Sequence, residues 1–195
     1  MDLKGKRLIL ASNSPRRREL LRGLDVDFVV DTQNNFEENF SADTPHPEVP
    51  ALMSRGKSHG FHRPLEKDEI LITSDTMVLL DSVIMGKPQS REEAVEMLRT
   101  LSGRTHEVIS AVTLRDGLGH EETFTDSTLV SFAELTDREI DYYIDNYKPF
   151  DKAGAYGVQE WIGYAAITRL DGSFYNVMGL PVHKVYDYLI KFASY

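Results

Sequence analysis

The stretch that decides the fold reads Leu8-Ile9-Leu10-Ala11-Ser12-Asn13-Ser14-Pro15-Arg16-Arg17-Arg18-Glu19-Leu20-Leu21. An apolar run, a polar break and a proline followed by leucines at helical spacing predict a strand, a tight turn and a helix. Ser14 suits the N-cap, and Pro15 suits the first helical position, where no backbone N–H is needed. This arrangement directs free backbone N–H groups and the positive end of a helix dipole at one point beyond the strand.

Two arginines stand in the first turn of this predicted helix. A cation is unfavourable there against the helix dipole, so an anionic ligand near Arg16 and Arg17 would resolve the conflict. Guanidinium groups match phosphate oxygens in pairs, which favours a phosphate. The alternative is a basic start of a surface helix whose arginines are only solvated.

Composition bounds the class of protein. The chain has 195 residues, 41% of them hydrophobic and 27% charged, which is enough to bury a core in one or two lobes. Its net charge of −9 argues against nucleic acid as a partner. The absence of cysteine excludes a disulfide framework and zinc–cysteine sites. There is no long apolar run and no signal-peptide pattern, so we expect no membrane association and a cytoplasmic location.

The rest of the chain alternates between strand and helix patterns. Thr136 to Glu139 forms a capping box that opens a helix ending near Tyr147. The predicted strands cover 26–30, 69–74, 77–80, 83–85, 107–114, 121–133 and 165–170, and further helices cover 48–61, 94–101 and 182–192. The helix over 48–61 contains the weak helix formers Ser54, Gly56 and Ser58. We therefore predict an α/β fold with a mixed central sheet flanked by helices, as a single domain over residues 1–195.

Several polar residues stand where an α/β protein binds its ligands. Asp75 follows the apolar run 70–73, which we predict to end there, and it could bind a metal or act as a general base; an Asx turn is the alternative. Lys87 could contact phosphate or only close a hairpin. Glu38 could offer a magnesium carboxylate or be solvated, and the Gln159 amide could recognise the edge of a base. Each signal is weak alone.

Other common site motifs are missing from the sequence. There is no Walker A loop and no Gly-x-Gly-x-x-Gly dinucleotide fingerprint. A Gly-x-Ser-x-Gly nucleophile elbow is also absent. The six histidines form no credible metal set. Trp161 and the nine tyrosines could stack on a base, but core or interface packing is the default explanation.

Taken together, the segments resemble the Maf family, the septum-formation-inhibitor-like nucleotide pyrophosphatases. The matching motifs span nearly the whole chain in the family's order; they are 10–21, 74–76, 86–88, 94–106, 151–159 and 176–181. Three departures stand out. Arg55-Gly56-Lys57-Ser58 replaces small apolar residues around the lysine, Glu160 replaces a glycine, and Ser74 replaces an alanine.

The resemblance implies two lobes around a nucleotide-binding cleft, as in Maf and ITPase-like folds, and a possible pairing of two copies as a homodimer. It implies hydrolysis of a nucleoside triphosphate to the monophosphate and pyrophosphate with Mg²⁺ or Mn²⁺. By position, the resemblance implies catalytic roles for Asp75, Lys87 and Lys57, with Asp75 as the proton acceptor. It implies that Glu38 and Asp75 bind the metal. The substrate-binding residues that it implies are Ser12, Arg16, Arg17, Thr76 and Gln159.

Substrate specificity follows from the same resemblance. Arg16, Thr76 and Gln159 match the branch of the family that acts on dTTP and UTP, and modified pyrimidine nucleotides are included in this expectation. A methylated-GTP pyrophosphatase of the same family is one alternative. The other is a nucleotide-binding regulator of cell division or septum formation with little turnover.

Overall fold

The computed structural model describes residues 1–195 and contains a seven-stranded sheet in the order β2-β1-β3-β5-β6-β7, with β4 paired to β3. β1 runs parallel to both β2 and β3, whereas β4 is antiparallel to β3 and β7 is antiparallel to β6. The predicted α/β class with a mixed sheet is therefore confirmed. None of the helices has the length and apolar character needed to span a membrane.

Strands and helices follow the predicted order along the chain, with two further short helices at 161–166 and 174–178 that were not predicted. The strands are β1 (Arg7–Leu10), β2 (Phe28–Val30), β3 (Glu69–Leu80), β4 (Val83–Met85), β5 (Thr105–Asp116), β6 (Glu121–Phe132) and β7 (Ile167–Asp171). The α-helices are α1 (Pro15–Arg22), α2 (Val49–His59), α3 (Arg91–Leu101), α4 (Asp137–Tyr147), α5 (Trp161–Ala166), α6 (Phe174–Met178) and α7 (Val182–Phe192). Two 3₁₀ turns cover His46–Glu48 and Ala153–Ala155.

Two helices begin where local capping chemistry places them. Ser14 Oγ accepts a hydrogen bond from the backbone N–H of Arg17, and Pro15 occupies the first turn of α1. At α4, Thr136 Oγ1 accepts from the N–H of Glu139, whose carboxylate accepts in return from the N–H of Thr136. Both caps satisfy N–H groups that would otherwise lack a partner at the helix start.

The chain divides into two units by its contacts. The first unit comprises Met1–Asp75, Ser110–Asp126 and Gly179–Tyr195, and the second comprises Thr76–Ile109 and Ser127–Met178. β3, β5 and β6 each contribute one part to either unit. The chain thus has two parts, as expected for two lobes, and it passes from one to the other within strands.

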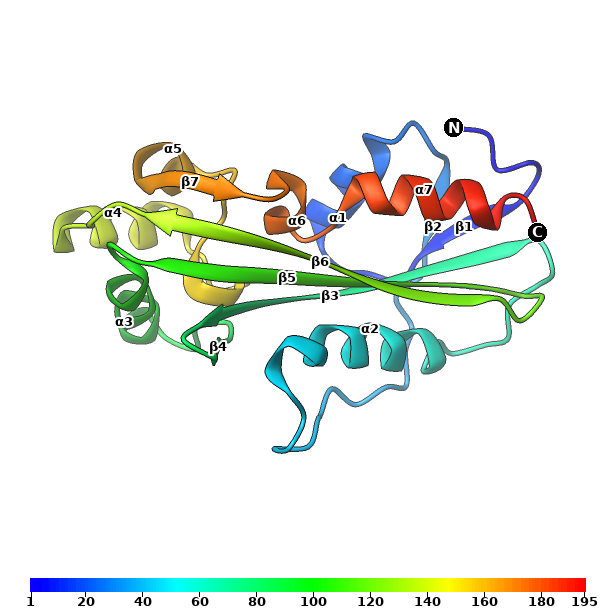
Figure 1. Cartoon of the computed structure of the whole chain (residues 1–195), viewed down its shortest axis with the longest axis horizontal. Helices are drawn as coiled ribbons and strands as arrows, with labels where there is room; N and C mark the ends of the chain where they lie inside the picture. Colours follow the sequence, from blue (N-terminus) through cyan, green and yellow to red (C-terminus); the bar gives the residue numbers. More distant parts are fainter. The chain divides into compact units, whose positions relative to one another are not determined.

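The core of the first unit lies between two helices. Leu8–Leu10 of β1 and Ile70–Ile72 of β3 are almost completely buried. α2 and α7 run along opposite faces of this part of the sheet (Figure 1). α7 directs Val185 and Leu189 into the core, and α2 contributes Met53. Strands buried on both faces explain the continuous apolar runs in β1 and β3.

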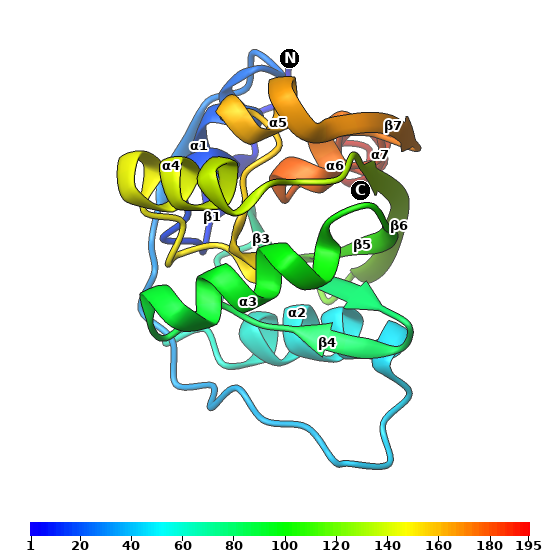
Figure 2. The same ribbon diagram turned by 90° about the vertical axis from the view of Figure 1, so that its left-hand side faces the viewer.

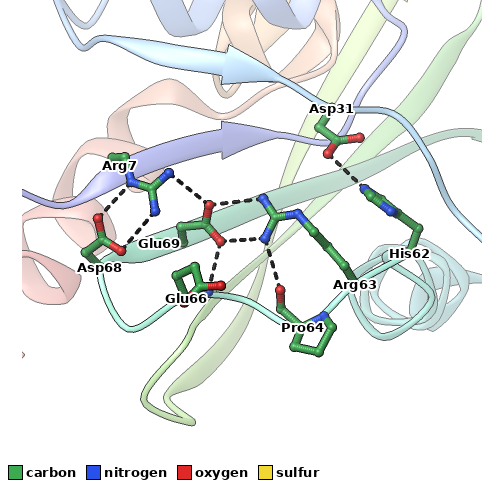
Figure 3. A network of polar contacts seen from close by, with 8 residues as sticks. All are labelled: Arg7, Asp31, His62, Arg63, Pro64, Glu66, Asp68 and Glu69. Carbon is green, nitrogen blue, oxygen red and sulfur yellow. Dashed lines mark hydrogen bonds and ion pairs between the residues drawn. The ribbon is translucent and has the colours of Figure 1, made fainter.

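A network of ion pairs fixes the amino ends of β1 and β3 (Figure 3). Arg7 in β1 binds the carboxylate of Asp68 through two hydrogen bonds of 2.7 and 3.0 Å and lies 3.2 Å from Glu69. Arg63 binds the buried Glu69 carboxylate at 2.7 and 3.0 Å, and this hydrogen bonding lowers the pKa of Glu69. Bidentate pairs of this kind set the register of neighbouring segments. They therefore help to determine which residues stand at the carboxyl ends of the same strands.

The second unit packs two helices against its part of the sheet. α3 and α4 lie side by side (Figure 2), and Arg91 of α3 contacts both Asp141 and Asp145 of α4 at 2.8 Å. Leu98 and Leu101 of α3 are fully buried. This packing supports the segment between α4 and α5, which contains Gln159.

Several strand boundaries lie one or two residues from the prediction, and two differences matter more. The segments predicted as separate strands at 69–74 and 77–80 form one strand, so β3 does not end at Asp75 but continues to Leu80. On one edge of β3, pairing with β1 reaches only Ile72 and pairing with β4 starts at Val78, so Asp75 lies in the stretch between these two partners. The polar residues predicted to end a strand thus lie inside one, beyond the carboxyl end of β1. β7 begins at Ile167 instead of residue 165, because the helical turn of α5 extends to Ala166.

Candidate active site

Lys57 in α2 stands between two carboxylates of the first unit. Its Nζ lies 2.7 Å from Asp75 Oδ1 in β3 and 2.8 Å from Glu38 Oε1 in the loop before α2. The side chains of Lys57 and Asp75 are about one-fifth exposed, at 19% and 20%, whereas that of Glu38 is 62% exposed. Three predicted site residues from distant parts of the sequence therefore meet as one group, which we call the Glu38–Lys57–Asp75 triad.

Buried hydroxyl groups hold α2 against β3 beside this triad. Ser54 Oγ donates to the carbonyl of Thr73 at 3.2 Å and to Thr113 Oγ1 at 3.0 Å, and Thr73 Oγ1 donates back to the carbonyl of Ser54 at 2.8 Å. All three side chains are fully buried. Ser54 precedes Lys57 by one helical turn and Thr73 precedes Asp75 by two residues, so these bonds set the approach of the ammonium to the carboxylate.

This role of the serines was not predicted from the sequence. Ser54 and Ser58 are weak helix formers by propensity, but both are buried on one face of α2. Arg115 of β5 donates to Ser58 Oγ at 3.1 Å and to the Ser58 carbonyl at 2.6 Å, close to the end of the helix. The i, i+4 spacing of two small polar residues was the available signal. It indicates a polar seam between a helix and a sheet.

Arg17 reaches from α1 to two backbone carbonyls near the triad. Its Nε donates to Gly179 at 2.9 Å and its Nη1 donates to Ser74 at 3.0 Å. Burial lowers the pKa of Arg17, while the nearby carboxylates of Asp75 and Glu38 raise it. The guanidinium thus anchors the backbone next to Asp75, in addition to supplying positive charge.

The turn between β1 and α1 is organised by its own hydroxyl groups. Ser12 is buried, and its Oγ accepts a hydrogen bond from the N–H of Ser14 at 3.2 Å. This bond uses a lone pair and leaves the hydroxyl hydrogen of Ser12 able to donate. Arg16 is partly buried beside Arg17, whose pKa it lowers by repulsion. The turn therefore has the donors that the sequence predicted for an anion.

The donor set of the first unit fits a divalent metal that is shared with phosphate. Asp75 and Glu38 offer carboxylate oxygens around Lys57, and no group of three or more histidine, aspartate or glutamate side chains gathers anywhere in the chain to hold a metal. Mg²⁺ is commonly bound through one or two carboxylates together with substrate phosphates and water. The residues thus fit Mg²⁺ or Mn²⁺ with a phosphate ligand, and they do not form a complete cage.

In the second unit, Gln159 presents an unused acceptor. Its Oε1 is buried and has no hydrogen-bond partner, which is costly unless a ligand supplies a donor. The segment around it is tied to α4. Tyr143 donates its hydroxyl hydrogen to the Glu160 carboxylate, and its oxygen accepts from the N–H of Gly157 at 2.9 Å. Lys152 Nζ lies 3.1 Å from the same carboxylate.

The two remaining predicted residues also belong to the second unit. Thr76 follows Asp75 directly in β3 and is partly buried, whereas Lys87 is exposed just after β4. The N–H of Gly154 donates to the carbonyl of Gly86 at 3.0 Å, so the segment with Lys87 is joined to the glycine-containing turn at 153–155. The structure therefore gathers Ser12, Arg16, Arg17, Glu38, Lys57 and Asp75 in one unit and places Thr76, Lys87 and Gln159 in the other.

Comparisons with known proteins agree with the sequence motifs. A family model described as Maf-like protein matches residues 7–192. A protein named dTTP/UTP pyrophosphatase from Porphyromonas gingivalis is 49% identical over 99% of this chain and 98% of its own length. One of the same name from Bacteroides thetaiotaomicron is 50% identical over 97% and 98%. Among solved structures, a nucleoside-triphosphatase / dITP/XTP pyrophosphatase from Mycobacterium abscessus has a TM-score of 0.44 and 17% identity, covering 66% of this chain and 75% of that one. The chain belongs to the Maf-like protein family.

Proposed function

We propose that this protein is a nucleoside triphosphate pyrophosphatase that hydrolyses dTTP and UTP to the monophosphate and pyrophosphate. The observation that carries the proposal is the Glu38–Lys57–Asp75 triad beside the β1–α1 turn, in a chain about half identical to proteins named dTTP/UTP pyrophosphatase. The cytoplasmic location and the homodimer stay predictions.

The reaction breaks the anhydride bond between the α- and β-phosphates. A water oxygen attacks phosphorus, the water's proton passes to the Asp75 carboxylate as general base, and pyrophosphate leaves with the bond's electrons. Lys57 holds Asp75 in place and offers positive charge to the phosphate oxygens. A Mg²⁺ or Mn²⁺ ion held by Asp75 and Glu38 would neutralise the charge that develops on those oxygens.

Binding of the triphosphate uses the cations of the first unit. Arg16 and Arg17 together with Lys57 place three positive charges near two carboxylates, a local excess in a chain of net charge −9. The hydroxyl of Ser12 and the start of α1 add donors for oxygen. In the second unit, Lys87 is the cation for which a role with phosphate is proposed.

Gln159 is the residue that selects the nucleobase of the substrate. Its unpartnered Oε1 can accept the N3–H of uracil or thymine, and its amide N–H can donate to a neighbouring carbonyl of the base. Cytosine has no hydrogen on N3, so a cytosine held in the same position would leave this buried acceptor without a donor from N3. Gln159 therefore supports dTTP and UTP over CTP.

The test is pyrophosphate release from dTTP, UTP, CTP, GTP and methylated GTP with Mg²⁺, for the wild type, Asp75→Asn and the exposed control Asp187→Asn. We expect turnover of dTTP and UTP, a loss of about a hundredfold or more in Asp75→Asn, and no change in the control. Turnover of guanine substrates instead would overturn the specificity. Binding of nucleotide without release of pyrophosphate would favour the regulator of cell division.

A further inference from the structure

The loop residue Phe36 is seated on two glycines of the segment that carries Lys57. A methyl group added at Gly56 would lie 2.3 Å from two atoms of the Phe36 ring, and one added at Gly60 would lie 2.6 Å from Phe36 Cβ and 2.8 Å from its backbone nitrogen. Contacts between real Cβ atoms and their neighbours are longer than this. The absence of side chains at Gly56 and Gly60 therefore creates the seat that Phe36 occupies.

Backbone hydrogen bonds fasten the same loop to the end of α2. Asn34 Nδ2 donates to the carbonyl of Lys57 at 2.6 Å, and the N–H of Asn35 donates to the carbonyl of Gly60 at 2.8 Å. Asn34 Oδ1 in turn accepts from the N–H of Phe36 at 2.8 Å. The loop is thus held to the carbonyls of Lys57 and Gly60 at residues 34 and 35. Phe36 follows directly, two residues before Glu38.

Gly56 lowers the stability of α2, and the contact with Phe36 explains why a glycine stands there. A glycine inside a helix is about 1 kcal/mol less favourable than alanine, and α2 has Gly56 in its interior. The Phe36 ring fills the space that alanine would need. Glu38 is largely exposed, so burial does not fix its side chain, and the nearest anchored side chain before it is that of Phe36.

We propose that Phe36, seated on Gly56 and Gly60, is a positioning residue that directs the Glu38 carboxylate to Lys57. The proposal rests on the proposed pyrophosphatase function, because the seat matters for activity only if the Glu38–Lys57–Asp75 triad is catalytic. The glycine before the lysine accommodates the aromatic ring of the loop.

The primary test is a set of variants assayed for kcat/KM with UTP and for thermal unfolding. Gly56→Ala moves the ring, and we expect kcat/KM to fall about tenfold or more, as for small misplacements at an active site, while the protein stays folded. Phe36→Val removes the ring that the seat holds, so it should lower kcat/KM as Gly56→Ala does, and Gly56→Ala/Phe36→Val should lose little more than either single variant. Gly60→Ala clashes with Cβ and the backbone nitrogen of Phe36, so a similar loss is expected there. Arg55→Ala, an exposed change in the same helix, is the control.

A second test asks whether the seat acts through Glu38. In a Glu38→Gln background, Gly56→Ala should cost little further activity, because the two changes disable the same element. Mn²⁺ affinity, measured by electron paramagnetic resonance without nucleotide, should fall in Gly56→Ala toward the value for Glu38→Gln. Full activity of a folded Gly56→Ala, or an undiminished loss in the Glu38→Gln background, would overturn the proposal. If Gly56→Ala does not fold, Phe36→Val alone is compared in both backgrounds.

The two proposals fail in different ways. A wild-type protein that releases no pyrophosphate from any nucleotide refutes the proposed function, and the Mn²⁺ titrations still decide whether the seat positions Glu38. A wild type that is active and a Gly56→Ala variant that matches it in kcat/KM and in Mn²⁺ affinity refute the seat alone.

Discussion

Acidification should destabilise the second unit through a single buried histidine. His106 in β5 is 2% exposed, and its ring packs edge-on against Phe132 and Tyr156 with centroid distances of 5.2 and 5.3 Å. One ring nitrogen lies 2.6 Å from the Tyr156 hydroxyl, and the other is buried without a partner. Burial lowers the pKa of His106 from 6.5 to about 4. A proton on this ring would place a charge among aromatic side chains. One of them, Tyr156, stands three residues before Gln159 in the sequence.

The sign and size of the effect follow from the two pKa values. The unfolded chain takes up this proton near pH 6.5, and the folded chain only near pH 4, so the folded state is favoured above pH 6.5 and loses stability as the pH falls. The loss is about 2 kcal/mol at pH 5 and approaches about 3 kcal/mol at pH 4. Carboxyl groups whose pKa values are lowered by folding, such as those of Asp31 and Glu69, stabilise the folded state above the usual pKa of a carboxyl group. Their contribution is lost mainly below about pH 4.5, where the unfolded chain takes up these protons. These carboxyl groups therefore contribute little between pH 7 and pH 5, and a variant at His106 separates its contribution from that of the other histidines.

The assay is urea unfolding of the wild type, His106→Phe and the exposed control His183→Gln at pH 7 and pH 5. His106→Phe leaves the Tyr156 hydroxyl without its partner and should lower stability at pH 7 by about 1–3 kcal/mol. What matters is the change with pH, which we expect to be about 2 kcal/mol smaller in this variant than in the wild type or the control. An equal loss between pH 7 and pH 5 in all three proteins would refute the reasoning.

Two further variants test how side chains act through the backbone. Tyr143→Phe removes the hydroxyl that joins Glu160 to Gly157, so we expect KM for UTP to rise several-fold, about threefold to tenfold, with a smaller change in kcat. An unchanged KM in steady-state kinetics would contradict this. Arg17→Lys keeps the charge but cannot bridge the carbonyls of Ser74 and Gly179, so kcat should fall about tenfold. If charge alone matters, the lysine variant will match the wild type while Arg17→Met does not.

Most of the fold could be predicted because its signals are local. The N-cap at Ser14 and the capping box at Thr136 depend on residues within one helical turn, and both helices begin where these signals lie. Buried strands such as β1 are apolar apart from the residue at the start, which also follows from the sequence. By contrast, the continuation of β3 through Asp75 depends on pairing with distant strands. A polar stretch inside a strand resembles a strand end when only the sequence is considered.

The sequence singled out the residues of the candidate site but not the way they are arranged. Local chemistry singled out Asp75 and Glu38, each with a structural alternative that local chemistry alone favours, and only the resemblance to a family joined them to Lys57. What joins them physically is spread over the chain. The seat of Phe36 on Gly56 requires a loop to meet a helix, and the bonds between Ser54 and Thr73 require that helix to meet β3.

Glycine and serine in α2 illustrate why the site could not be worked out from propensities. Each weakens the helix by the local scale, so the pattern at 54–58 lowers the expectation of a helix. The structure shows that Ser54 and Ser58 form buried bonds and that Gly56 receives an aromatic ring. Local rules fail at this point because the residues serve contacts that are distant in sequence, and such conflicts are concentrated at functional sites. The weakest part of the predicted helix is therefore the part that carries Lys57.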